Sequence, residues 1–128
     1  MSQTRRLRLL GMRLDVCRLA PDAEIPEGLH RESFYSLTHT DNELSLVCRE
    51  SSAPQQGRVE SGWRCLAVAG PLEFSEVGVL AALTLPLAEA GVSVFAISTY
   101  DTDYLLVKEE RLEEAIRSLQ AAGHEVLP

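Results

Sequence analysis

The sequence predicts an α+β fold built from two related units in tandem, with helices against an antiparallel sheet. The first observation is an apolar hairpin, in which the runs 92–97 and 104–107 flank a polar, aspartate-bearing turn at 98–103. The second is a near-copy of this hairpin sixty positions upstream, and such a repeat constrains a fold more than one motif does. The matching residues Leu37, Thr38, Asp41, Glu43, Leu46, Val47 and Glu50 correspond to Ile97, Ser98, Asp101, Asp103, Leu106, Val107 and Glu110.

The composition favours a soluble globular protein. The chain has 128 residues and is 45% hydrophobic, which is enough to bury a core. Its net charge of -7 argues against nucleic acid as the main partner, because a phosphate backbone is normally bound by a basic surface. Five arginines near the N-terminus could contact nucleic acid or lipid, but we prefer to interpret them as solvated charges that alternate with apolar residues along a strand. They are Arg5, Arg6, Arg8, Arg13 and Arg18.

Features of a membrane or metal protein are not expected. No apolar run is long enough to span a bilayer, and the start of the chain is not typical of a signal peptide, so we expect a cytoplasmic protein that does not bind membranes. Cys17, Cys48 and Cys65 form no CxxC motif and are odd in number, which predicts reduced, buried thiols. The three histidines are scattered, so neither a metal site nor a cofactor is predicted.

The first unit, assigned to residues 1–60, is predicted to be reduced. Its first strand is marked by alternating apolar residues from Leu10 to Cys17. Two prolines and a glycine between 21 and 32 leave room for only a short helical turn. The remaining elements are predicted to be a hairpin with strands 34–40 and 44–48 and a polar linker at 51–62, with the boundary between the units near Glu60.

The second unit, residues 61–128, begins with a predicted strand at 63–69 and a helix at 75–90. Ser75 is expected to cap this helix, with Glu76 in its first turn. Pro86 is expected to bend it and Gly91 to end it.

The apolar hairpin of the second unit comes next and is followed by a second helix and a short last strand. Apolar residues at helical spacing predict the helix at 112–122, and residues 124–127 can form the strand. The resulting order, strand-helix-strand-strand-helix-strand, is typical of a ferredoxin-like fold. Residues 92–99 are largely apolar on both faces, so we expect the first unit or a second copy of the chain to cover them, as in a homodimer.

Two motifs, GPLEFSEVGVL at 70–80 and ISTYDTDYLLV at 97–107, give the chain a family resemblance. Together with FYSLTHTDNELSLVCRE at 34–50, they resemble the ACT domain family. The resemblance is to the branch with paired ACT domains, which includes small bacterial proteins and the cytosolic arginine sensors of animals. The resemblance implies a βαββαβ regulatory module that binds an amino acid at an interface between ACT units, as in the regulatory part of aspartate kinases. The chain has no room for a kinase domain and no nucleotide-binding glycine motif.

Carried over to this sequence, the resemblance implies a ligand site between two loops. A helix start offers unpaired amides to an α-carboxylate, and Gly78 leaves space for close approach. Acidic side chains can accept hydrogen bonds from an ammonium group. Ser75 stands where the arginine sensors can carry an acid, so the ligand can differ from arginine. The implied site residues are Phe74, Ser75, Glu76, Val77 and Gly78 on one side and Thr99, Tyr100, Asp101 and Asp103 on the other.

Three classes of function remain open at this level. The leading hypothesis is a non-catalytic amino-acid-binding regulatory module, and the alternative is a structural or oligomerisation module without a ligand. In the second case Asp101 and Asp103 are simply turn residues, Glu76 complements a helix dipole, and Gly78 serves packing. An enzyme that uses paired carboxylates ranks last, because no nucleophile, base or metal ligand is placed beside them.

Overall fold

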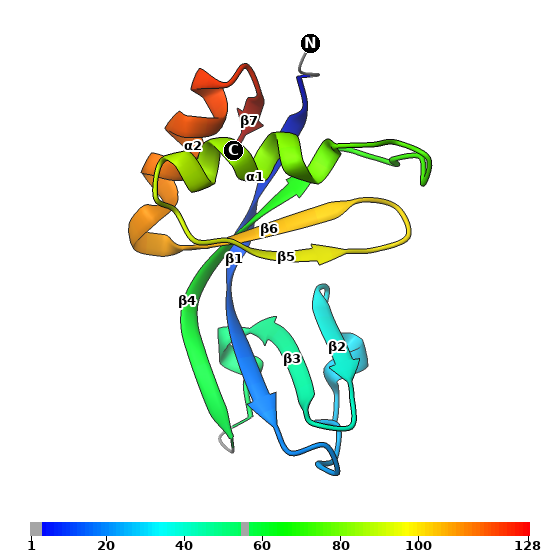
Figure 1. Ribbon diagram of the computed structural model, residues 1–128. Coiled ribbons are helices and arrows are strands. Elements are labelled where there is room, and N and C mark those ends of the chain that lie inside the picture. The colour runs from blue at the N-terminus through cyan, green and yellow to red at the C-terminus, as the bar shows by residue number, and fades with distance from the viewer. Residues whose placement is uncertain (1–3, 55–56) are drawn as a thin grey trace. The chain divides into compact units, whose positions relative to one another are not determined.

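The computed structural model describes residues 4–54 and 57–128, which form seven strands and two α-helices (Figure 1). Short 3-10 turns lie at Leu29–Arg31, Glu50–Ser52 and Glu109–Arg111. The larger elements are β1 (Arg6–Leu19), β2 (Tyr35–His39), β3 (Leu44–Arg49), β4 (Arg58–Val68), α1 (Val79–Glu89), β5 (Phe95–Ser98), β6 (Asp103–Lys108), α2 (Leu112–Ala121) and β7 (Glu125–Leu127).

The chain divides into two compact units, and the division does not follow the order of the sequence. The N-terminal unit is Met12–Trp63, whereas the C-terminal unit joins Met1–Gly11 to Arg64–Pro128. Strands β1 and β4 therefore contribute residues to both units. The compact units are defined by contacts between residues, whereas the predicted units 1–60 and 61–128 are defined by a repeat in the sequence. The division of the chain into two repeats therefore stays a prediction.

The N-terminal unit is a small antiparallel arrangement. Strand β3 pairs with β1 on one side and with β2 on the other, so that Cys48 lies opposite both Asp15 and Tyr35. The predicted hairpin is confirmed, and the proline-containing segment after β1 forms only the turn Leu29–Arg31. A small buried cluster fills this unit and consists of Cys17, Leu29, Leu46 and Cys48.

The C-terminal unit has the predicted βαββαβ order, from β4 through α1, β5, β6 and α2 to β7. Its strands lie in the order β7-β1-β4-β6-β5. The sheet was predicted to be antiparallel, but one of its pairs is parallel. Strand β7 pairs in parallel with β1, with Arg6 opposite Glu125. The Ala69 N–H, directly after β4, donates to the Arg6 carbonyl at 2.8 Å, whereas the Glu125 N–H of β7 donates to the Arg5 carbonyl at 2.9 Å. Carbonyls of successive residues in an extended chain point to opposite edges, so β4 and β7 lie on opposite edges at the start of β1.

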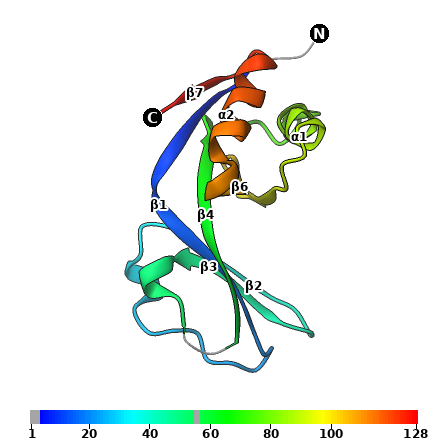
Figure 2. The same cartoon turned by 90° about the vertical axis from the view of Figure 1, so that its left-hand side faces the viewer.

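The two helices of the C-terminal unit cover one face of its sheet. In Figure 2, α1 and α2 lie on the same side of β4 and β6. The predicted apolar stripe of α2 is buried at Ala115 and Leu119, and α1 buries Leu83 and Leu87 against the same core. The C-terminal unit therefore has a core of its own.

Four predicted starts of elements were wrong. Strand β1 begins at Arg6 and not at Leu10, and β5 begins at Phe95 and not at residue 92. Strand β4 begins at Arg58 and not at Trp63, because it lies beside the long strand β1 and the second half of the predicted linker is drawn into the sheet. Helix α1 begins at Val79, so Ser75 is not its cap and Glu76 precedes it. The residues before the helix instead form their own turn, in which the Glu76 N–H donates to the Glu73 carbonyl at 3.0 Å.

The other end of α1 agrees with the prediction. Pro86 lies inside the helix, and Gly91 follows the last turn with a left-handed φ of 75°.

The three cysteines are free and buried, as predicted. Burial raises the pKa of the Cys48 and Cys65 thiols to about 12. Across residues 4–54 and 57–128, no three histidine, cysteine or acidic side chains come together in a way that could hold a metal ion. In the same ranges, no helix has the length and apolar character needed to cross a membrane.

Candidate functional site

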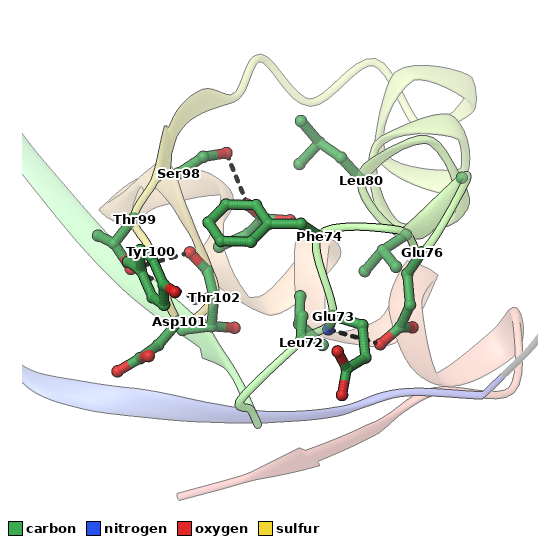
Figure 3. Close-up of a pocket in the computed structure, with 13 residues that line it drawn as sticks. Leu72, Glu73, Phe74, Glu76, Leu80, Ser98, Thr99, Tyr100, Asp101 and Thr102 are labelled. Carbon is green, nitrogen blue, oxygen red and sulfur yellow. Dashed lines mark hydrogen bonds between the residues drawn. The ribbon is translucent and has the colours of Figure 1, made fainter.

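A cavity of about 280 Å³ lies within the C-terminal unit, between the segment that precedes α1 and the turn of the β5–β6 hairpin (Figure 3). Its walls come from segments 72–80 and 98–103. The lining residues are Leu72, Glu73, Phe74, Glu76, Gly78, Val79, Leu80, Ser98, Thr99, Tyr100, Asp101, Thr102 and Asp103.

The two walls are joined directly at the base of the loops. The Leu72 N–H donates to the Asp101 carbonyl oxygen at 2.7 Å. A Cβ atom at Gly70 would lie 3.1 Å from both that oxygen and the Thr102 Cβ, so glycine permits this close approach. The segment before α1 is therefore held against the hairpin turn, which keeps the two walls of the cavity together.

The hairpin wall is a closed turn with its own hydrogen bonds. The Thr99 N–H donates to the Thr102 carbonyl at 2.8 Å, and the Thr102 hydroxyl donates to the Val68 carbonyl in β4 at 2.7 Å. Across the hairpin, the Ser98 hydroxyl donates to Asp103 Oδ1 at 2.6 Å. These bonds fix the two aspartates of the turn relative to the sheet.

The other wall includes the start of α1. The Ala82 N–H donates to the Gly78 carbonyl at 2.9 Å, so the amides from Val79 to Ala81 have no carbonyl to reach within the helix. Gly78 itself has a φ of +82°, and no other atom lies within 4 Å of where its Cβ would stand. Because Gly78, Val79 and Leu80 line the cavity, the positive end of the helix dipole lies at its wall.

Glu76 has both carboxylate oxygens engaged within the protein. Its Oε2 lies 2.5 Å from Arg5 Nη2, and its Oε1 accepts a hydrogen bond from the Glu73 N–H at 3.1 Å. The Arg5 guanidinium, and after it the Glu73 amide, hold the pKa of Glu76 below its usual value. Glu76 is therefore an ionised anchor for its own loop, and Arg5 is not a solvated strand residue as the sequence suggested.

Two exposed aromatic side chains meet across the cavity. The rings of Phe74 and Tyr100 are in edge-to-face contact, with centroids 4.7 Å apart and planes at 89°. Phe74 is 76% exposed and Tyr100 is 80% exposed. Figure 3 shows the Phe74 ring between the two walls, and the exposure of both rings means that neither belongs to the packed core.

The structure brings together seven of the nine residues predicted from the sequence. Ser75 and Val77 do not line the cavity, and Val77 is 95% exposed. The residues that line it are Phe74, Glu76, Gly78, Thr99, Tyr100, Asp101 and Asp103. The prediction missed Leu72, Glu73, Val79, Leu80, Ser98 and Thr102, although all of them lie inside or next to the two quoted motifs.

The lining of the cavity combines acidic side chains with backbone amides. Its carboxylates are those of Glu73, Glu76, Asp101 and Asp103, and none of the lining residues is basic. Such a set favours a cationic group on one side, while the helix start favours a carboxylate on the other.

Comparisons with known proteins agree with this geometry. The family model of the ACT domain matches residues 58–121, and a model of an N-terminal domain matches residues 13–56. The chain belongs to the ACT domain family. The ACT match covers both walls of the cavity, and ACT domains have a regulatory ligand-binding role.

Two relatives show how far the similarity of the ACT protein extends. A protein of known structure from Agobacterium tumefaciens is 36% identical, with 98% of this chain and 94% of that chain covered and a TM-score of 0.91. The human cytosolic arginine sensor for mTORC1 subunit 1 is 41% identical over 59 residues, which are 45% of this chain. The matched part is only 18% of the length of that sensor.

A third comparison concerns the fold alone. The regulatory subunit of aspartate kinase from Thermus thermophilus, in its ligand-free form, is 11% identical and has a TM-score of 0.64. The alignment covers 96% of this chain and 99% of that chain. The mixed fold of a mainly antiparallel sheet and two helices is thus shared with that regulatory subunit.

Proposed function

We propose that this ACT protein is a non-catalytic regulatory module that binds an amino acid in the cavity between segments 72–80 and 98–103. The observation that carries the proposal is that a helix start and an acidic turn line the same cavity. These groups match the two charges of a zwitterion. The volume of about 280 Å³ lies just below the range of roughly 300–1,000 Å³ for ligand pockets, which suits an amino acid better than a nucleotide.

Each end of the ligand has a chemically suitable partner. The α-carboxylate would accept hydrogen bonds from the amides at Val79 and Leu80, where the helix dipole adds a favourable field. The α-ammonium would donate to Asp101 or Asp103, and such charge-assisted bonds are about twice as strong as neutral ones. Glu76 is assigned to the loop and not to the ligand, because both of its oxygens are already bonded.

The chemistry of the lining favours binding over catalysis. None of the lining residues is a cysteine or a histidine, and the hydroxyl of Ser98 donates its hydrogen bond to Asp103. The Ser98 hydroxyl does lie beside the Asp103 carboxylate, but their hydrogen bond closes the hairpin, and among the described residues no histidine lines the cavity to activate a serine as a nucleophile. We therefore propose a sensor or regulator that acts in the cytoplasm, without a cofactor and without nucleic acid or membrane as partner.

Isothermal titration calorimetry with each of the twenty amino acids tests the proposal. We expect at least one to bind the wild-type protein and Asp101→Asn to weaken that binding by about tenfold, since a charged hydrogen-bond acceptor is lost. The matched control is Asp41→Asn, which changes the equivalent turn residue of the β2–β3 hairpin and should leave affinity unchanged. If no amino acid binds the wild-type protein, the proposal is wrong.

A structural or oligomerisation role is the second candidate, and the exposed apolar side chains favour it. Val77 is 95% exposed and Leu85, on the outer side of α1, is 61% exposed. Surfaces of this kind are often covered by a partner, and a second copy of the chain is the partner we propose. Sedimentation equilibrium of the wild type and of Val77→Ser/Leu85→Ser distinguishes the two roles. A constitutive dimer that binds no amino acid and that the double substitution dissociates would favour the structural role.

A further inference from the structure

Arg5 is held at three points, all within the C-terminal unit. Its N–H donates to His124 Nδ1 at 3.0 Å, and its carbonyl oxygen accepts from the Glu125 N–H at 2.9 Å. Its guanidinium reaches Glu76 Oε2 at 2.5 Å. The Arg5 side chain is only 16% exposed, so the surrounding fold holds it in place.

His124 links the backbone of Arg5 to helix α1. Because Nδ1 accepts a hydrogen bond from the Arg5 N–H, Nδ1 carries no proton, and the neutral ring has its proton on Nε2. Nε2 lies 3.4 Å from the Ala82 carbonyl oxygen, to which it can donate. Ala82 is in the first turn of α1, and His124 is 5% exposed. The buried imidazole therefore fixes Arg5 relative to the helix whose start lines the cavity.

The side chain of Arg5 changes the charge of the cavity without lining it. Of the four lining carboxylates, Glu76 is the one that pairs with a guanidinium within the described residues. The charged residues that line the cavity are all acidic, and the ion pair places a positive charge next to them. The pair also occupies a carboxylate oxygen of Glu76 that a cationic ligand could otherwise approach. Removal of Arg5 would leave the same cavity with one more unbalanced negative charge.

We propose that Arg5 is a specificity-determining residue of the cavity, which lowers its preference for cationic over neutral amino-acid side chains by neutralising Glu76. The inference rests on the proposed function, because it concerns the ligands of the same cavity. It also assigns Glu76 a role in selectivity through its charge and not through contact with the ligand.

The test is the ratio of affinities for two amino acids of nearly equal shape and different charge. Arginine and citrulline form such a pair, and lysine and norleucine form a second. Arg5→Gln should shift the affinity ratio towards the cationic member by about threefold to tenfold, as expected for one charge several ångströms away near a protein surface. Glu76→Gln should shift the ratio in the opposite direction.

The double variant Arg5→Gln/Glu76→Gln separates charge from structure. If Arg5 acts by neutralising Glu76, the affinity ratio of the double variant should return close to the wild-type ratio. If Arg5 acts only as a structural contact, the second substitution should not restore the ratio. Arg6→Gln is the matched control, because Arg6 pairs with Glu125 at 2.6 Å and neither residue lines the cavity. Circular dichroism checks that each variant is folded, and Arg5→Lys, which keeps the charge, should keep the ratio.

The outcomes distinguish this inference from the proposed function. If amino acids bind and Asp101→Asn weakens them, but Arg5→Gln leaves the ratio unchanged, the role of Arg5 is refuted and the binding function stands. If Arg5→Gln does not fold, Glu76→Gln and Arg5→Lys still decide, and an unchanged ratio in Glu76→Gln overturns the inference. If no amino acid binds the wild-type protein, both proposals fall.

Discussion

Replacement of Gly78 by alanine tests the geometry of the cavity wall. Gly78 has a φ of +82°, in the left-handed region, and no atom lies within 4 Å of the position of an added Cβ. The cost is therefore conformational and not steric. A left-handed non-glycine residue costs about 1–2 kcal/mol, and the stiffer unfolded chain offsets about 0.4–1 kcal/mol of this. We expect Gly78→Ala to lower the free energy of unfolding by about 1 kcal/mol.

Gly91 provides a matched control at the other end of α1. Its φ is +75°, and an added Cβ would likewise meet no atom within 4 Å, but Gly91 does not line the cavity. Urea unfolding, followed by circular dichroism and extrapolated linearly to water, should give a similar loss for Gly91→Ala. Calorimetry should show weaker amino-acid binding in Gly78→Ala alone, since its methyl group is added at a residue of the cavity wall.

Two results would refute this reasoning. A Gly78→Ala protein at least as stable as the wild type would mean that the left-handed turn before α1 is absent, and a loss above about 3 kcal/mol would mean that the space around Gly78 is filled. An equal loss of binding in Gly91→Ala would mean that the effect arises from the helix as a whole and not from the cavity wall.

Two further predictions concern the core of the C-terminal unit. Leu83→Ala, at a fully buried position of α1, should cost about 2–5 kcal/mol in urea unfolding, whereas Leu85→Ala, at a position 61% exposed, should stay within about 0.5 kcal/mol of wild type; equal losses would contradict the assigned helix orientation. Burial raises the pKa of the Cys65 thiol from 9.0 to about 12. The contribution of the protonated thiol to the free energy of unfolding is therefore complete below pH 9 and is lost as pH rises towards 12. Between these values the wild type should lose about 1.4 kcal/mol per pH unit more than Cys65→Ala, and parallel pH profiles of unfolding would disprove the assignment.

Much of the candidate site follows from local sequence. The residues Thr99 to Thr102 form the polar turn of the hairpin as predicted, because a turn is specified by a few neighbouring residues. Gly78 lay inside the predicted helix, whereas the structure gives it a left-handed φ directly before α1. The start of α1 was misplaced by three residues, because its cap is Gly78 and not Ser75. Ser75 and Glu76 resemble a helix start in composition, but Glu76 bonds to Glu73 and Arg5 instead.

The sequence by itself determined the βαββαβ order, both hairpins, the buried stripe of α2 and the glycine that ends α1, because each depends on residues a few positions apart. Only the tertiary structure decided that β7 pairs with β1, that β4 starts at Arg58, and that Arg5 bonds to Glu76, 71 positions away. Strand partners and ion pairs between distant segments are selected by the burial and hydrogen bonding of the whole unit, and their local sequences do not encode them.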